Sequence, residues 1–227
     1  MASPGMGQTR TLRLAHRGDH RQHPENSLAA IVAALDVPAC DGVEFDVRAS
    51  RDGVPVVVHD GTLARVQGRA EAVADLTATE LTALGVPALA DVLAALPHRA
   101  VLDVELKETF GRGLIEVLAA GRGPDLHHTV ISSFDPVALE RVRALVPGWP
   151  TWLNADDLEP ATIRTAVDTG CRGVSVEWTR LQPEVIAAAH AAGLEVAAWT
   201  VTQRRAYRRL ADLGVVAICV EGSALTG

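Results

Sequence analysis

Three carboxylates fall at alternate positions in two short apolar segments of the first half of the chain. Glu44 and Asp46 belong to residues 42–47, and Glu105 belongs to residues 100–106. Residues two apart share one face of a β-strand, and a carboxylate buried among Val and Phe is costly unless a cation pairs with it. Oxygens on short, rigid strands suit one hard divalent cation, Mg²⁺ or Ca²⁺, although arginine could also neutralise the first pair. Zn²⁺ is disfavoured because soft ligands are absent from this group.

Two histidines, His16 and His59, each follow a predicted strand directly. That position is hard to explain as solvated surface, and histidine exchanges protons near neutral pH. Arg17 and Lys107, the only lysine of the chain, accompany them. Together with a metal, these side chains predict a site for an anion that needs proton transfer. A phosphoester fits, because cations bind its oxygens while one histidine removes a proton and the other protonates the leaving oxygen.

The other histidines are assigned by their places in the predicted elements. His20 and His23 lie in the loop after the first strand and fit either a surface or a site. The rest lie at strand starts or within helices and are interpreted as structural: His98, His127, His128 and His190.

Segments rich in Val, Ile and Leu alternate with Ala/Leu-rich segments of helical period. Strands are predicted at 12–15, 42–47, 55–58, 100–106, 129–132, 150–153, 173–176, 194–199 and 216–220. Helices are predicted at 27–35, 137–145, 160–169, 183–192 and 204–213. Strands separated by helices in this way indicate an α/β protein with a parallel sheet covered on both faces.

The linker 48–53 is too short for a helix and ends in Asp-Gly, which predicts an antiparallel hairpin between the second strand and residues 55–58. Without that extra strand, eight strands remain and predict a closed (β/α)8 TIM barrel. Residues 60–87 then form a short insertion, residues 11–227 a single domain and residues 1–10 a flexible N-terminus. An open doubly wound sheet is the alternative, but no Gly-rich phosphate loop follows the first strand. A barrel carries its site at the C-terminal ends of its strands, where these polar residues gather.

Composition narrows the function further. Of 227 residues, 48% are hydrophobic and 22% charged, which is typical of a globular protein with a large core. The net charge of −7 disfavours nucleic acid as a partner. No apolar run reaches the length of a membrane span, and residues 1–10 do not resemble a signal peptide, so stable membrane insertion is not expected. Cys40, Cys171 and Cys219 are interpreted as free thiols in a reducing compartment, hence a cytoplasmic protein, with a disulfide or metal cluster as the alternative.

Four motifs occur in a specific order: AHRG from residue 15, PENS from residue 24, DGVEFDVRASRDGVPVVVHDGTLAR from residue 41 and VLDVELK from residue 101. With ISSFD and AGLEVAAWTV further on, they resemble the glycerophosphodiester phosphodiesterase family over about residues 13–202. The resemblance implies a (β/α)8 barrel with a small insertion after the extra strand. It also implies hydrolysis of a small-molecule glycerophosphodiester to an alcohol and glycerol 3-phosphate.

The same resemblance implies roles for individual residues. By motif position, His16 and His59 would be the acid/base pair, Arg17 and Lys107 would contact phosphate, and Glu25 and Asn26 would lie close by. The carboxylates that would hold one divalent metal are Glu44, Asp46 and Glu105.

The last strand departs from the family pattern. Val220 and Glu221 stand where Thr and Asp are expected, which leaves substrate preference and barrel closure near the first strand open. A non-catalytic phosphoester-binding barrel and a phospholipase-type enzyme acting on lipid head groups are the alternative functions. The oligomeric state is also open. Three tryptophans near strand ends could surround a quaternary ammonium group or serve only in packing: Trp152, Trp178 and Trp199.

Overall fold

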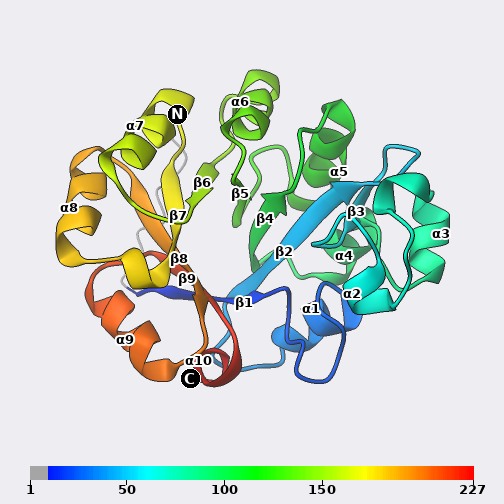
Figure 1. The fold of residues 1–227 in the computed structure, drawn as a ribbon, viewed down its shortest axis with the longest axis horizontal. Coiled ribbons are helices and arrows are strands. Elements are labelled where there is room, and N and C mark those ends of the chain that lie inside the picture. The colour runs from blue at the N-terminus through cyan, green and yellow to red at the C-terminus, as the bar shows by residue number, and fades with distance from the viewer. Residues whose placement is uncertain (1–9) are drawn as a thin grey trace.

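The computed structural model describes residues 10–227, and Figure 1 shows its helices surrounding a central set of strands. The strands are β1 (Leu12–His16), β2 (Gly42–Ala49), β3 (Pro55–Val57), β4 (Val101–Leu106), β5 (Thr129–Ser133), β6 (Thr151–Ala155), β7 (Gly173–Glu177), β8 (Glu195–Val201) and β9 (Ala217–Val220). The longer helices are α1 (Leu28–Ala34), α4 (Leu89–Ala95), α5 (Arg112–Arg122), α6 (Pro136–Leu145), α7 (Pro160–Thr169), α8 (Pro183–Ala191) and α9 (Arg204–Asp212). The shorter ones are α2 (Ala64–Gln67), η1 (Val73–Asp75), α3 (Ala78–Ala83), η2 (Trp178–Arg180) and α10 (Gly222–Leu225).

The sheet is a closed parallel barrel. Its strand order is β1-β9-β8-β7-β6-β5-β4-β2-β3, and the additional pairing of β1 with β2 closes it. Every pairing is parallel except that of β2 with β3. The predicted TIM barrel with one extra antiparallel strand is therefore confirmed.

The hairpin forms where the short linker predicts it. Val47 pairs with Val57 and Ala49 with Pro55, and the amide of Ser50 donates to the carbonyl of Val54. After β3 the chain enters residues 60–87, which hold α2, η1 and α3. They pack around a small apolar cluster that also includes Val56 of β3 and Val58. The predicted flexible N-terminus falls almost wholly on residues 1–9, which lie outside the described part of the chain.

The five predicted helices form with ends within one residue of those expected. Two barrel helices, α4 and α5, were not among the predictions. Helix α5 contains Gly113 and Gly121, which lower its helix propensity. A Cβ on Gly121 would lie 2.8 Å from Leu93 of α4, so glycine at this position lets the two helices approach closely. None of the described helices has the length and apolar character needed to cross a bilayer.

The barrel interior changes from apolar to polar along its axis. Its lower part is filled by apolar side chains: Leu12, Leu14, Val101, Val130, Trp152, Ala197, Ala217 and Cys219. Above them, buried Ser132 of β5 donates to buried Asp103 of β4 over 2.6 Å. The C-terminal ends of the strands carry the charged residues. An apolar floor under a polar mouth leaves the mouth as the place for chemistry.

Gly42, at the start of β2, allows β2 and β4 to pair closely. A Cβ at this position would lie 1.8 Å from the carbonyl oxygen of Val101, which is backbone and cannot turn aside. We expect Gly42→Ala to lower the free energy of unfolding by about 1–3 kcal/mol or more, the cost of overpacking. Gly111→Ala is the matched control, because a Cβ there meets nothing within 4 Å. Equal urea midpoints for the two variants would contradict this account of the β2–β4 contact.

Candidate active site

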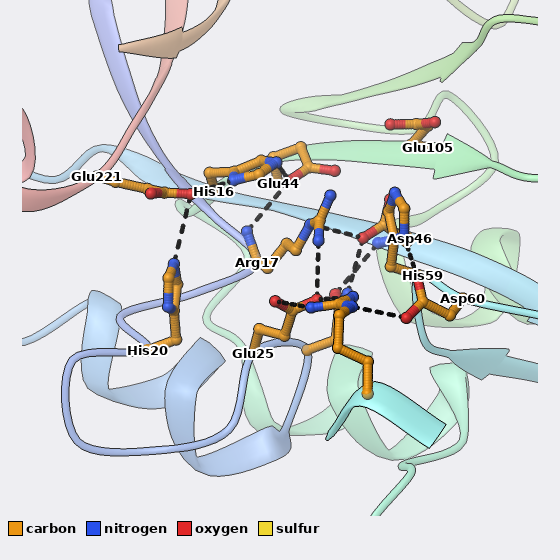
Figure 2. Close-up of polar contacts among 12 residues, drawn as sticks. His16, Arg17, His20, Glu25, Glu44, Asp46, His59, Asp60, Glu105 and Glu221 are labelled. Atoms are coloured by element: carbon orange, nitrogen blue, oxygen red, sulfur yellow. Dashed lines mark hydrogen bonds and ion pairs between the residues drawn. The ribbon is translucent and has the colours of Figure 1, made fainter. Parts of the chain in front are cut away.

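A cavity of about 180 Å³ opens at the mouth of the barrel. One side is lined by residues of β1, β2 and β4 and of the chain after β3. The other side is lined by residues of β6, β7, β8 and β9 and by Phe134, which follows β5. Of the seven residues predicted for the site, six line this cavity: His16, Arg17, Glu44, His59, Glu105 and Lys107. The seventh, Asp46, is fully buried beside them, and Figure 2 shows it near Arg17 and His59.

The register of β2 against β4 brings the three predicted carboxylates together. Asp46 lies opposite Glu105, and Glu44 is two residues earlier on the same inward face. One carboxylate oxygen from each of the three residues lies within 4.8 Å of the others. Alternation along two neighbouring strands is therefore enough to concentrate the negative charge.

Asp46 is the best-neutralised member of this carboxylate cluster. Its Oδ1 lies 2.8 Å from Nζ of Lys107, and its Oδ2 lies 3.2 Å from Nε of Arg17. The amide Nδ2 of Asn26 donates to Oδ2 over 2.7 Å. Burial alone would raise the pKa of Asp46, but the charges of Lys107 and Arg17 outweigh burial, so the pKa is lowered. This carboxylate remains ionised because its cations are built into the fold.

The negative charges of Glu44 and Glu105 are less well neutralised by nearby cations than that of Asp46. Burial and the neighbouring charge of Asp46 raise the pKa of both. Oε2 of Glu44 accepts a hydrogen bond from the backbone amide of Arg17 over 3.1 Å, whereas Oε1 is buried without a partner. The cluster is short of positive charge and rich in hard oxygen donors. This donor set fits a divalent cation such as Mg²⁺ or Ca²⁺ and not a thiophilic metal.

Arg17 directly follows β1 and joins the loop after β1 to the carboxylate cluster. Its backbone has φ +56°, in the left-handed region that residues other than glycine rarely occupy. In that conformation its amide faces Glu44, and its guanidinium reaches both Asp46 and Glu25, with 2.8 Å between NH1 and Oε1 of Glu25. Strain at this position is offset by the buried ion pairs that it makes possible.

Both predicted histidines have a carboxylate on Nδ1. Nδ1 of His16 lies 2.6 Å from Oε1 of Glu221, and Nδ1 of His59 lies 2.6 Å from Oδ1 of Asp60. Nε2 of His16 lies 3.9 Å from Oε2 of Glu44. Burial lowers the pKa of His59 in spite of Asp60, which favours the neutral ring.

Arg65 is a site residue that the sequence analysis missed. It extends from α2 of the insertion, donates to Asp60 over 2.7 Å and makes two 2.7 Å hydrogen bonds to Glu25. Its hydrogen bond lowers the pKa of Asp60 to about 2. Against the opposing effect of burial, Arg65 and Arg17 lower the pKa of Glu25 to about 2. The motif HDGTLAR contains Arg65, but nothing in the spacing indicates that it returns to Glu25, 40 positions earlier.

The opposite wall holds residues that the sequence analysis left without a role. Asn154 and Ser175 line the cavity from β6 and β7, and Oδ1 of Asn154 is buried without a partner. Trp199 packs edge-on against Phe134 with ring centroids 5.5 Å apart. Trp152, by contrast, is buried in the apolar floor. The three-tryptophan enclosure considered for a quaternary ammonium group is therefore wrong, because Trp152 lies below the cavity.

The chain is similar to known proteins over most of its length. The sequence model of the glycerophosphoryl diester phosphodiesterase family matches residues 16–223. A glycerophosphodiester phosphodiesterase of Caldanaerobacter subterraneus subsp. tengcongensis is 27% identical over 93% of this chain and 94% of its own length. A probable glycerophosphodiester phosphodiesterase 1 of Mycobacterium tuberculosis is 31% identical over 84% of this chain and 81% of its own length.

The same similarity extends to solved structures. The structure of an Oleispira antarctica phosphodiesterase in complex with the product sn-glycerol-3-phosphate is 26% identical, with a TM-score of 0.83. The match covers 93% of each chain. With the family match spanning most of the sequence and the barrel preserved, the chain belongs to the glycerophosphoryl diester phosphodiesterase family.

Proposed function

We propose that this protein is a glycerophosphodiester phosphodiesterase that hydrolyses its substrate to an alcohol and glycerol 3-phosphate with the help of one divalent cation. The observation that carries the proposal is the convergence of three carboxylates and two histidines on one cavity, in a chain of this family. The bound sn-glycerol-3-phosphate of the Oleispira relative supports the same product. The proposed catalytic unit is a single domain, residues 11–227, with its insertion at residues 60–87.

Glu44, Asp46 and Glu105 would hold the cation, which is Mg²⁺ or Ca²⁺ according to the donor set. When bound, such an ion stabilises negative charge on phosphoryl oxygens and lowers the pKa of a coordinated hydroxyl group. The unpartnered Oε1 of buried Glu44 supports this assignment, because an orphaned carboxylate oxygen is costly without a cation.

Arg17 and Lys107 are proposed to bind the phosphate group. Both line the cavity and both already contact Asp46, so they stand at the boundary between the carboxylate cluster and the open space. A phosphodiester carries one negative charge, which these side chains can meet without moving from the wall. Charge stabilisation of this kind strengthens as negative charge builds up in the transition state.

His16 and His59 are proposed as the general acid/base pair. The substrate's own 2-hydroxyl oxygen attacks phosphorus and the bond from phosphorus to the alcohol oxygen breaks. One histidine takes the hydroxyl proton while the other protonates the leaving oxygen. The product of this step is a cyclic phosphate, which water opens to glycerol 3-phosphate with the two histidines in reversed roles. The attacking hydroxyl is on the same molecule as the phosphorus. The protein therefore only has to hold the substrate in the orientation that allows attack.

A cytoplasmic location is also proposed. Its support is that Cys40, Cys171 and Cys219 are all free in the structure, as expected in a reducing compartment.

The first test removes the metal. We expect chelation to abolish hydrolysis of a panel of glycerophosphodiesters, and Mg²⁺, Ca²⁺ or Mn²⁺ to restore it. Glu105→Gln keeps the side-chain shape but removes a ligand charge, so calorimetry should show metal affinity about 10- to 100-fold weaker. His59→Ala, expected to be at least about 100-fold slower, is the control for contaminating hydrolases.

Three results would contradict the proposed function or favour one of its alternatives. Full activity in metal-free protein would contradict the metal assignment of the three carboxylates. Metal and substrate binding without turnover on any diester would support a non-catalytic phosphoester-binding barrel. Faster turnover on lipid head groups in vesicles than on water-soluble diesters would support the phospholipase-type alternative.

The second test concerns Lys107. Lys107→Met should raise KM and lower kcat together, because the charge binds substrate and contributes more in the transition state. Lys107→Arg should also lose activity, since the broader guanidinium has to fit between Asp46 and Glu105 in a nearly buried position. Arg99→Met, which removes an exposed cation at the opposite end of β4, is the matched control. Unchanged steady-state kinetics in Lys107→Met would remove Lys107 from the site.

The third test uses a diester that lacks the glycerol 2-hydroxyl. Intramolecular attack gains effective concentration worth several kcal/mol, so the deoxy diester should be cleaved at least about 100-fold more slowly than its parent. Its inhibition constant against the parent should stay close to the parent's KM, which shows that it still binds. Equal cleavage rates would mean that water attacks directly and that no cyclic phosphate forms.

A further inference from the structure

His16 and Glu221 are 205 positions apart in sequence and in direct contact. The contact follows from closure of the barrel, because β1 pairs with β9 and Ala15 lies opposite Val220. The next residue on each strand is then His16 and Glu221.

The backbone of Glu221 is held on both sides. Its amide donates to the carbonyl of Val201 on β8 over 2.9 Å, and its carbonyl accepts from the amide of Ala224 over 3.1 Å. The residue also forms the N-terminal boundary of α10. The Glu221 carboxylate is therefore held at a rigid strand end, and 29% of the Glu221 side chain is exposed.

The contact determines which nitrogen His16 offers to the cavity. An ionised carboxylate only accepts hydrogen bonds, so Nδ1 of His16 carries the proton in the 2.6 Å contact with Glu221. In the neutral ring Nε2 is then unprotonated, and Nε2 is the nitrogen on the side of Glu44. A general base needs its unprotonated nitrogen on the reacting side.

The two histidines of the site are arranged alike. His59 also has a carboxylate on Nδ1, and that carboxylate, Asp60, is fixed by Arg65 over 2.7 Å. The corresponding neighbour of Glu221 is His20 of the loop after β1, whose Nε2 lies 3.5 Å from the same Oε1 that contacts His16. Figure 2 shows Glu221 between His16 and His20 on one side of the view, and His59 with Asp60 on the other.

We propose that Glu221 is a positioning residue, which holds His16 in the tautomer with the proton on Nδ1 and Nε2 toward the cavity, and that His20 steadies the Glu221 carboxylate. The kinetic part of this inference rests on the proposed phosphodiesterase function. The structural part does not, because the tautomer can be measured without substrate.

The test combines nitrogen-15 NMR with kinetics on the full chain. At a pH where the imidazoles are neutral, long-range proton–nitrogen spectra of the wild type should show His16 protonated on Nδ1; loss of signals in His16→Gln assigns them. In Glu221→Leu the ring should shift toward the form protonated on Nε2. In Glu221→Gln, whose amide oxygen can still accept, the Nδ1 form should persist.

The variants that shift the His16 tautomer most should also lose the most activity. We expect kcat at least about tenfold lower in Glu221→Leu with KM within about threefold of the wild type, since misplacing a catalytic histidine's proton affects the chemical step. Glu221→Gln and His20→Gln should lose less. Glu177→Gln is the matched control, because this carboxylate at the end of β7 contacts Thr179 and, among residues 10–227, pairs with no histidine.

Two outcomes would overturn the inference. One is a wild-type His16 protonated on Nε2. The other is a Glu221→Leu protein that is folded by thermal melt and keeps both the wild-type tautomer and the wild-type kcat. If no diester is hydrolysed at all, the proposed function fails while the NMR measurement still decides what Glu221 does.

Discussion

The buried carboxylate of Asp46 is the constraint around which the mouth of the barrel is built. It lies in the interior of β2, where an unpaired charge would be very costly. Three side chains from two segments, the loop after β1 and the end of β4, reach it: Arg17, Asn26 and Lys107. Arg17 and Asn26 both have positive φ, at +56° and +58°, and the amide of Asn26 donates to the carbonyl of Arg17. The loop after β1 therefore adopts a strained conformation that brings two partners to one carboxylate. The excess negative charge that remains, on Glu44 and Glu105, is what a divalent cation would neutralise.

Closure of the barrel is the second feature that determines where the site residues lie. β1 pairs with β2 on one side and β9 on the other, so His16 lies between the carboxylate cluster and the last strand. The insertion after β3 acts in the same way on the other histidine, since Arg65 connects Asp60 to Glu25. Each histidine is thus oriented by a carboxylate that the fold brings to it.

Much of this arrangement can be predicted from sequence, for physical reasons. Alternation along two strands identifies Glu44, Asp46 and Glu105, and the short linker before residue 55 places His59 beside them. What sequence could not predict depends on long-range register or on exposed side chains. The contact of His16 with Glu221 exists only because the first and last strands pair, and Arg65 belongs to a four-residue helix with no buried residue to anchor it. The depth of Trp152 in the floor likewise follows from barrel packing and not from its place near a strand end.

Thermal unfolding with and without metal tests the central claim most directly, namely that the buried carboxylate cluster is a cation site completed by the fold. An ion that binds only the native state at 100 times its Kd adds about 2.7 kcal/mol to stability, so Tm of the wild type should rise with Mg²⁺ or Ca²⁺ concentration. In Glu44→Gln, which removes the carboxylate with the unpartnered oxygen, the rise should disappear while the metal-free protein stays at least as stable as the wild type. A wild-type Tm that does not respond to either ion, or the same rise in both proteins, would contradict the account.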